Sequence, residues 1–212
     1  MTTLAIMKAR IASELRRSDL TTQIADAINT AIGAYEHERW YVNETRENTF
    51  TTVAEQPNYG VSDAAFIGVL SKIDYIFLTV GNQPFELLPE TMKFIEDSGT
   101  NNTFLGQPGW YAFYDEQIWL YPVPNDPWTV RVGGVIEQAA PVSDAEIGNF
   151  WMIKGERLTR SRAKYEIQLH VLKNAQAAME MATAVTEAYD QLNVRTTRKT
   201  KTGPGRVRAM KF

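Results

Sequence analysis

Residues 20–35 read LTTQIADAINTAIGAY. The apolar side chains of this stretch recur at steps of three and four, which predicts an amphipathic helix. Ser18 and Asp19 can cap its beginning, and we expect it to end near Trp40. Such a helix needs a second apolar surface against which to bury its stripe. The fold therefore depends on where the rest of the sequence supplies that surface.

Helical periodicity recurs on both sides of this stretch. Residues 3–17 carry one apolar stripe, and helical spacing returns from about residue 147 to residue 192, after a possible cap at Ser143-Asp144. Asn174 can cap a further helix, so we predict two helices that meet near Lys173. The stripes of the first and last helices are the obvious apolar partners for one another.

The sequence between these helices is typical of a small sheet. Threonines, aromatic residues and turn residues dominate it, and a short helix is expected from Pro89 to about Asp97. The prolines of residues 122–127 predict a connector outside the sheet, because proline cannot donate to a strand ladder. Strands are predicted at residues 50–53, 73–80, 85–88, 110–114, 118–121 and 128–136, with turns at 56–60 and 81–83.

These segments predict an α+β fold. We expect residues 1–44 and 143–193 to form a helical bundle, and residues 45–142 to form a β-rich insertion. After Asn193 the periodicity disappears, which predicts a basic, extended C-terminal arm over residues 194–212.

Composition excludes several kinds of chemistry. The chain has 212 residues and no cysteine, so disulfides, thiolate metal sites and a cysteine nucleophile are ruled out. No apolar run approaches the roughly 20 residues that a membrane span requires. The net charge is −3, but residues 195–212 hold seven basic residues and no acidic one, which leaves about −10 for the rest. Such asymmetry often indicates an interaction segment.

Catalytic and cofactor motifs are missing. The sequence has no phosphate-binding glycine loop, no dinucleotide fingerprint and no serine elbow. His37 and His170 are the only histidines and lack a metal-ligand spacing, so neither a metal nor a cofactor is expected. The carboxylates that could form a glycosidase pair all lie in helix-end or turn contexts, and we expect no enzyme activity. These carboxylates are Glu36, Glu38, Glu44, Asp115 and Glu116.

Aromatic residues gather around the predicted sheet. Aromatic platforms can stack single-stranded bases, but a nucleic-acid groove also needs positive charge. Between residues 47 and 136 the only basic residues are Lys72, Lys93 and Arg131. A sheet core or a subunit interface is therefore the favoured interpretation. The aromatic residues concerned are Trp40, Tyr41, Trp110, Tyr111, Phe113, Tyr114, Trp119, Tyr121 and Trp128.

The order of these features resembles the head-to-tail adaptor proteins of tailed bacteriophages, also called connector, head-completion or tail tubular A proteins. Members begin with two helices and an aromatic stretch, here Arg39 to Glu44, and continue with a variable β region. That region contains a Gly-x-Pro segment, here Gly106 to Tyr111, and a strand that runs into Pro-x-Pro, here Ile118 to Pro124. They close with helices rich in arginine and alanine, here Arg160 to Glu166, and an extended segment such as Gly205 to Arg208.

The resemblance implies a virion protein of the neck or tail, assembled in the cytoplasm of the host bacterium. It implies a ring, usually of about twelve subunits, between the portal protein and a downstream tail or nozzle protein. Genomic DNA would pass through the channel without specific binding, and no membrane would be involved. Some short-tailed relatives are described as cell-wall hydrolases, but no residues here support that activity.

The basic arm has two interpretations. It can dock on the portal protein and order there, or it can bind DNA through phosphates as a nucleic-acid-binding module. We expect portal docking, because Met210 and Phe212 offer an apolar anchor that DNA binding does not need. The residues expected to bind the portal are Arg195, Arg198, Lys199, Lys201, Arg206, Arg208, Lys211 and Phe212.

Overall fold

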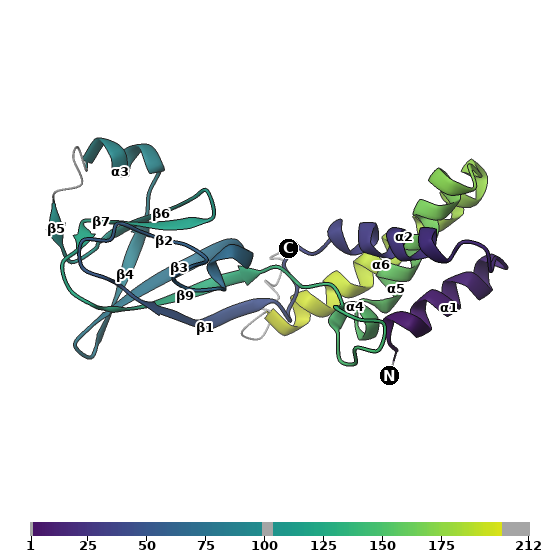
Figure 1. Ribbon diagram of the computed structural model, residues 1–212, viewed down its shortest axis with the longest axis horizontal. Coiled ribbons are helices and arrows are strands. Elements are labelled where there is room, and N and C mark those ends of the chain that lie inside the picture. Colours follow the sequence, from purple (N-terminus) through teal and green to yellow (C-terminus); the bar gives the residue numbers. More distant parts are fainter. Residues whose placement is uncertain (1, 99–103, 201–212) are drawn as a thin grey trace, which may run out of the picture. The chain divides into compact units, whose positions relative to one another are not determined.

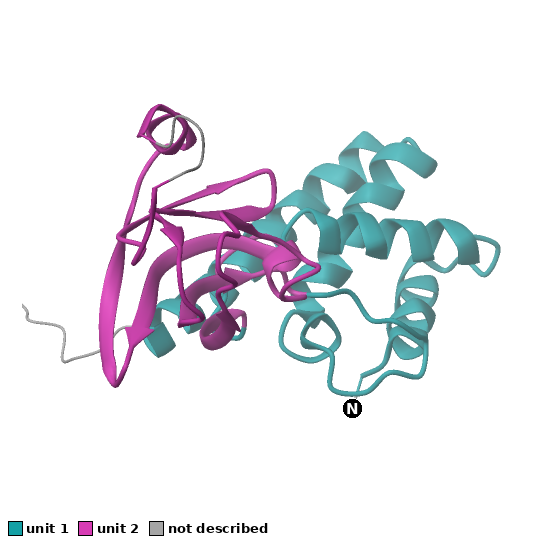
Figure 2. Cartoon of the chain, turned by 60° about the vertical axis from the view of Figure 1, so that its left-hand side comes forward, with its two compact units in different colours: residues 1–36, 40–42, 139–212 teal, residues 37–39, 43–138 magenta. Residues whose placement is uncertain are grey.

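The computed structural model describes residues 2–98 and 104–200. Residues 1–36, 40–42 and 139–212 form unit 1, and residues 37–39 and 43–138 form unit 2 (Figure 2). Each unit has its own apolar core. The α+β class is confirmed, since unit 1 is helical and unit 2 is built mainly on strands (Figure 1).

Unit 1 has five α-helices and one π-helical turn among the described residues. The helices are α1 (Leu4–Leu15), α2 (Thr21–Gly33), α4 (Phe150–Ile153), α5 (Glu156–Glu166) and α6 (Ala175–Thr200), with the π-turn η2 (Ile167–Val171) before α6.

The apolar stripes of these helices share one core. Met7 and Ile11 of α1 and the buried face of α2 pack with Trp151, Leu158 and other residues of the later helices. Helix α5 contacts α1, α2 and α6, so it lies at the centre of the unit. Glu14 adds ion pairs from α1 to α5, with Arg160 at 3.0 Å and Lys164 at 2.7 Å. Pairs this exposed add little stability, so apolar burial is the main stabilising term.

Two expected caps are wrong. Helix α2 has Leu20 at its N-cap position with no side-chain hydrogen bond, because both carboxylate oxygens of Asp19 accept from the Arg17 guanidinium at 2.7 Å. That hydrogen bond lowers the pKa of Asp19 to about 2. No helix starts after Ser143-Asp144, and the next one begins at Phe150 with Asn149 as its cap.

Helix α2 ends at Gly33 and not near Trp40, as we expected. The Trp40 indole N–H donates to the Tyr35 carbonyl at 3.1 Å. In a continuous helix that carbonyl would accept from the backbone of Arg39 instead. The chain turns here because Trp40 packs into the core of unit 1. The cap predicted at Asn174 is confirmed, since its side-chain oxygen accepts the Ala177 N–H at 3.1 Å.

Unit 2 contains a seven-stranded sheet, a two-stranded sheet and a short helix, α3 (Met92–Ser98). The strand order in the larger sheet is β1-β9-β3-β4-β6-β7-β2. In this sheet β4 and β6 are parallel, and all other neighbouring strands are antiparallel. Its strands are β1 (Glu44–Thr51), β2 (Asn58–Tyr59), β3 (Leu70–Val80), β4 (Gln83–Pro89), β6 (Trp110–Tyr114), β7 (Gln117–Tyr121) and β9 (Thr129–Ile136). The 3-10 turn η1 (Ile67–Val69) precedes β3.

Two segments expected to be turns or connectors are paired. Asn58 and Tyr59 form β2 against β7, inside the turn predicted at residues 56–60. Residues 122–127 were expected outside any sheet, yet β8 (Val123–Pro124) pairs with β5 (Leu105–Gly106). A two-residue strand tolerates proline because few ladder donors are needed.

Two adjacent glycines allow β9 to lie close to β3. A Cβ atom on Gly134 would meet the Lys72 carbonyl oxygen at 2.1 Å, and one on Gly133 would meet the Tyr75 ring at 2.2 Å. The register between β3 and β9 shifts at the same place. The central pair of the sheet therefore requires glycine at position 134, where the contact is with backbone, whereas at position 133 the Tyr75 side chain would have to move.

We predict that Gly134→Ala destabilises unit 2 by about 2–3 kcal/mol, because backbone atoms must move to admit the methyl group. The matched control is Gly109→Ala, where nothing lies within 4 Å of the new Cβ atom. Denaturant unfolding followed by circular dichroism measures both. Equal midpoints for the two variants would contradict the close approach of β3 and β9.

Candidate interaction surfaces

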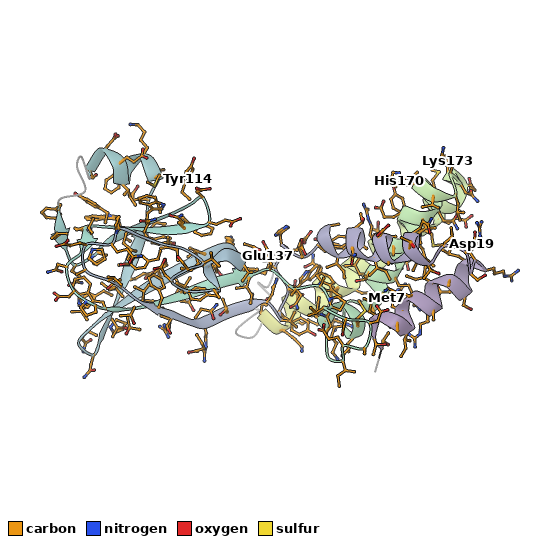
Figure 3. The ribbon with its side chains drawn as sticks, in the orientation of Figure 1. Met7, Asp19, Tyr114, Glu137, His170 and Lys173 are labelled. Carbon is orange, nitrogen blue, oxygen red and sulfur yellow. The ribbon has the colours of Figure 1, made fainter. Side chains whose placement is uncertain are left out.

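The carboxylates considered for catalysis lie in several different elements. Glu44 begins β1 and lies 3.9 Å from Arg39. Asp115 and Glu116 are exposed in the two-residue turn after β6, beside Tyr114, with φ angles of 52° and 55° (Figure 3). Positive φ at both positions is the requirement of a tight hairpin turn. Their placement is thus explained by the hairpin.

A carboxylate lies close to each histidine. His37 Nδ1 lies 3.1 Å from a Glu137 oxygen, and His170 Nε2 lies 3.3 Å from a Glu166 oxygen. His170 lies in η2, near Lys173 at the turn before α6 (Figure 3). Across residues 2–98 and 104–200, no three His, Asp or Glu side chains gather in a way that could hold a metal ion. No helix in the same ranges is both long and apolar enough to cross a membrane.

A polar hollow of about 460 Å³ lies beside the hairpin turn of unit 2. Asp63, Asp115 and Glu116 line it together with uncharged residues, among them Val61. Burial alone would raise the pKa of Asp63, but hydrogen bonds from Gly60, Gln56 and Ser62 lower it below its usual value. These bonds hold the loop after β2, which explains the position of Asp63 structurally.

Helix α6 is longer than expected. We predicted the loss of helical structure after Asn193, but α6 continues to Thr200. Arg195, Arg198 and Lys199 therefore lie on a helix and not on an extended arm. Lys201, Arg206, Arg208, Lys211 and Phe212 lie outside the described residues.

A buried threonine explains the longer helix. Thr196 follows Leu192 by four residues and is buried, and its hydroxyl donates to the Leu192 carbonyl at 3.1 Å. Thr200 repeats this bond to the Thr196 carbonyl at 3.0 Å. Because threonine is polar, Thr196 does not appear in the apolar pattern of the sequence, although its spacing of four residues from Leu192 continues the buried stripe of α6. The hydroxyl can be buried because its own helix satisfies it.

The end of α6 presents basic side chains beside an exposed valine. Arg195 and Arg198 line a shallow groove of about 340 Å³ together with Asp190, Gln191 and Val194, and Val194 is 49% exposed. Lys199 takes another direction, and its Nζ lies 4.0 Å from the centroid of the Tyr41 ring. Lysine over an aromatic face is attracted to the ring quadrupole. Hence two of the three described basic residues are available to a partner, and the third is held by Tyr41.

The aromatic residues do not form one cluster. Trp40 and Tyr41, which we grouped with the sheet, belong to unit 1, where Trp40 contacts Phe150 and Tyr189. Tyr111 lies in the core of unit 2, and Phe113 packs against that core. Sequence spacing could not separate them, because both faces of β6 carry aromatic side chains.

A second aromatic group lies on the opposite face of β6 and β7. Trp110 and Tyr121 are direct neighbours across the strands, with ring centroids 6.1 Å apart. Phe94 of α3 lies 5.9 Å from Trp110, and Phe104 lies 6.3 Å from Tyr121. We call these four rings the outer aromatic surface. Phe94 and Phe104 were not selected from the sequence, since neither lies in a recognisable motif.

Exposed charged and aromatic surfaces are typical of a protein that binds other components. The family model of the SU10 adaptor protein matches residues 2–208, and the chain belongs to this family. It is a structural adaptor protein of bacteriophages, with a place in the virion. No curated protein matches the chain.

We predict that truncation after Val194 lowers the unfolding midpoint of unit 1 by several degrees. It removes the buried Thr196 and the contact of Lys199 with Tyr41, a loss of about 1–2 kcal/mol. Truncation after Thr200 is the matched control and should leave the midpoint unchanged. Differential scanning calorimetry compares the two. If both shortened proteins melted together, the last turns of α6 would not contribute to packing.

Proposed function

We propose that the protein forms a ring between the portal and the tail of a bacteriophage. In this ring it seals the DNA channel and provides a docking platform for a downstream tail or nozzle protein. The family match over residues 2–208 carries the proposal. Ring subunits bind by heterologous contacts that close by rotation, and we propose about twelve subunits per ring.

The helices of unit 1 act in this proposal as a bundle, and unit 2 acts as a lobe inserted into it. The chain outside residues 195–212 carries about −10 charges. A negative body adheres weakly to DNA, so the genome can pass through the channel without specific binding. The protein works as a structural component and not as an enzyme.

The basic segment docks on the portal protein. Arg195 and Arg198 extend from the end of α6, and four further basic residues follow in residues 201–212 without an intervening acidic residue. Arginine pairs well with carboxylates because its fork donates two parallel hydrogen bonds. Phe212 supplies an apolar anchor beside these charges. An acidic portal surface with an apolar pocket is the matching site.

We predict that truncation after Thr200 abolishes attachment to the purified portal, because it removes Lys201, Arg206, Arg208, Lys211 and Phe212. The packed part of α6 remains, so loss of folding does not explain the result.

The double variant Arg195→Gln, Arg198→Gln should weaken attachment by about tenfold, because the contribution of each exposed charge lies between a fraction of a kcal/mol and roughly 1 kcal/mol. Sedimentation of portal complexes measures both.

The nucleic-acid alternative makes a different prediction for the same proteins. A DNA-binding segment gives an affinity that falls steeply with salt, with a slope set by the number of phosphates neutralised. The control is Lys93→Gln in α3, which should change neither result. If the shortened protein kept its portal binding but lost DNA binding, the segment would be a DNA-binding module.

We predict that the free protein is mainly monomeric and that rings form on the portal. The sequence has no heptad seam that would drive association, and ordering of the basic segment needs a partner. Native mass spectrometry of the protein with and without portal measures the effect. Stable closed rings in the absence of portal would contradict it.

A further inference from the structure

The outer aromatic surface lies on the face of the sheet that is turned away from the core of unit 2. Leu88, Trp110 and Tyr121 are matched across β4, β6 and β7, so they share one face. The residues next to them, including Tyr111 and Leu120, are buried in the core on the other face. Helix α3 covers part of the outer face, where it contacts β6 and β7 (Figure 1).

The covering by α3 is incomplete. Phe104 is 61% exposed, Leu88 is 57% exposed and Leu105 is 45% exposed. The Tyr121 hydroxyl donates to the Ser98 carbonyl at 3.0 Å, which holds the ring in place beside the end of α3. Preordered rings next to exposed aliphatic side chains are typical of a binding surface and not of a sheet core.

The charges around these rings are mostly negative. Glu86, Glu90 and Glu96 are exposed, on β4 or in the segment that continues into α3. Lys93 is the one basic residue between positions 73 and 130, and it pairs with Asp97 at 2.6 Å. Arg131 lies in the same cross-strand row as Glu86, where it covers the Phe77 ring. A partner that brings positive charge therefore finds exposed glutamates on both sides of Leu88 in the sequence, while Lys93 is already paired.

Elsewhere in the chain, aromatic rings already hold cations. Arg131 lies 5.3 Å from the Phe77 ring centroid, Arg162 lies 5.0 Å from Tyr165, and Lys199 lies 4.0 Å from Tyr41. None of these three contacts involves the outer aromatic surface. Its rings combine the same π-faces with a negative surrounding, which increases the attraction for a cation.

We propose that the outer aromatic surface binds an extended segment of another virion protein, one that carries arginine or lysine beside an aliphatic side chain. The cations would lie over Phe104 and near Glu90, which follows Leu88 by two residues, and the aliphatic groups would cover Leu88 and Leu105. Single-stranded nucleic acid also stacks on such rings, but its phosphates are repelled by the exposed glutamates. This inference rests on the proposed function in one respect, namely that the partner is a virion protein.

The test uses the full-length protein and a fluorescein-labelled peptide of alternating arginine and leucine, followed by fluorescence anisotropy. Phe104→Ser should weaken binding about fivefold, which corresponds to roughly 1 kcal/mol from one exposed aromatic contact. Glu90→Gln should weaken it by a smaller factor and reduce its salt dependence. Phe85→Ser is the matched control, since Phe85 is 45% exposed on β4 but points to the face opposite Leu88.

Four results would overturn the proposal. They are equal binding of a glutamate–leucine peptide, unchanged binding by both variants, tighter binding of a labelled oligothymidine, and a loss of self-association on Phe104→Ser. Portal attachment is measured separately and should be unaffected by Phe104→Ser. A failure at this surface is thereby distinguished from a failure of the adaptor function.

Discussion

The burial of one apolar stripe, that of α2, constrains the rest of the protein. Ile24, Ile28 and Ile32 are almost completely buried, and the helix that packs against them is α5, which follows the whole β region in the sequence. Trp40 and residues 150–152, close to the two ends of the intervening segment, still join this core, whereas the residues of the β region form a core of their own. Two separate cores follow from this order of segments, because each amphipathic element must bury its apolar face.

Within unit 2, the main constraint is the contact between β3 and β9. Gly133 and Gly134 let the two strands approach where their register shifts, and β1 and β4 then extend the sheet on either side. The parallel pairing of β4 with β6 places Leu88 beside Trp110. The outer aromatic surface depends on this pairing, because the two side chains come from different hairpins.

The two units differ in the chemistry that they expose. The end of α6 carries arginines beside an exposed valine, while the outer face of β4, β6 and β7 carries aromatic rings among glutamates. Membership of the SU10 adaptor protein family implies interaction with other phage structural proteins. Surfaces of opposite charge on separate units suit binding to two different partners, since each surface repels the partner of the other.

The sequence by itself determined the α+β class, the amphipathic helices, the cap at Asn174 and the uneven charge. These depend on periodicity and composition, which are local properties. Only the tertiary structure decided that α2 ends at Gly33, because Trp40 must turn back to reach a core formed by distant residues. It likewise decided that α6 continues to Thr200, where a buried threonine is satisfied by its own helix. The division of the aromatic residues between two cores and an outer surface depends on strand pairing, and pairing joins residues that no local pattern connects.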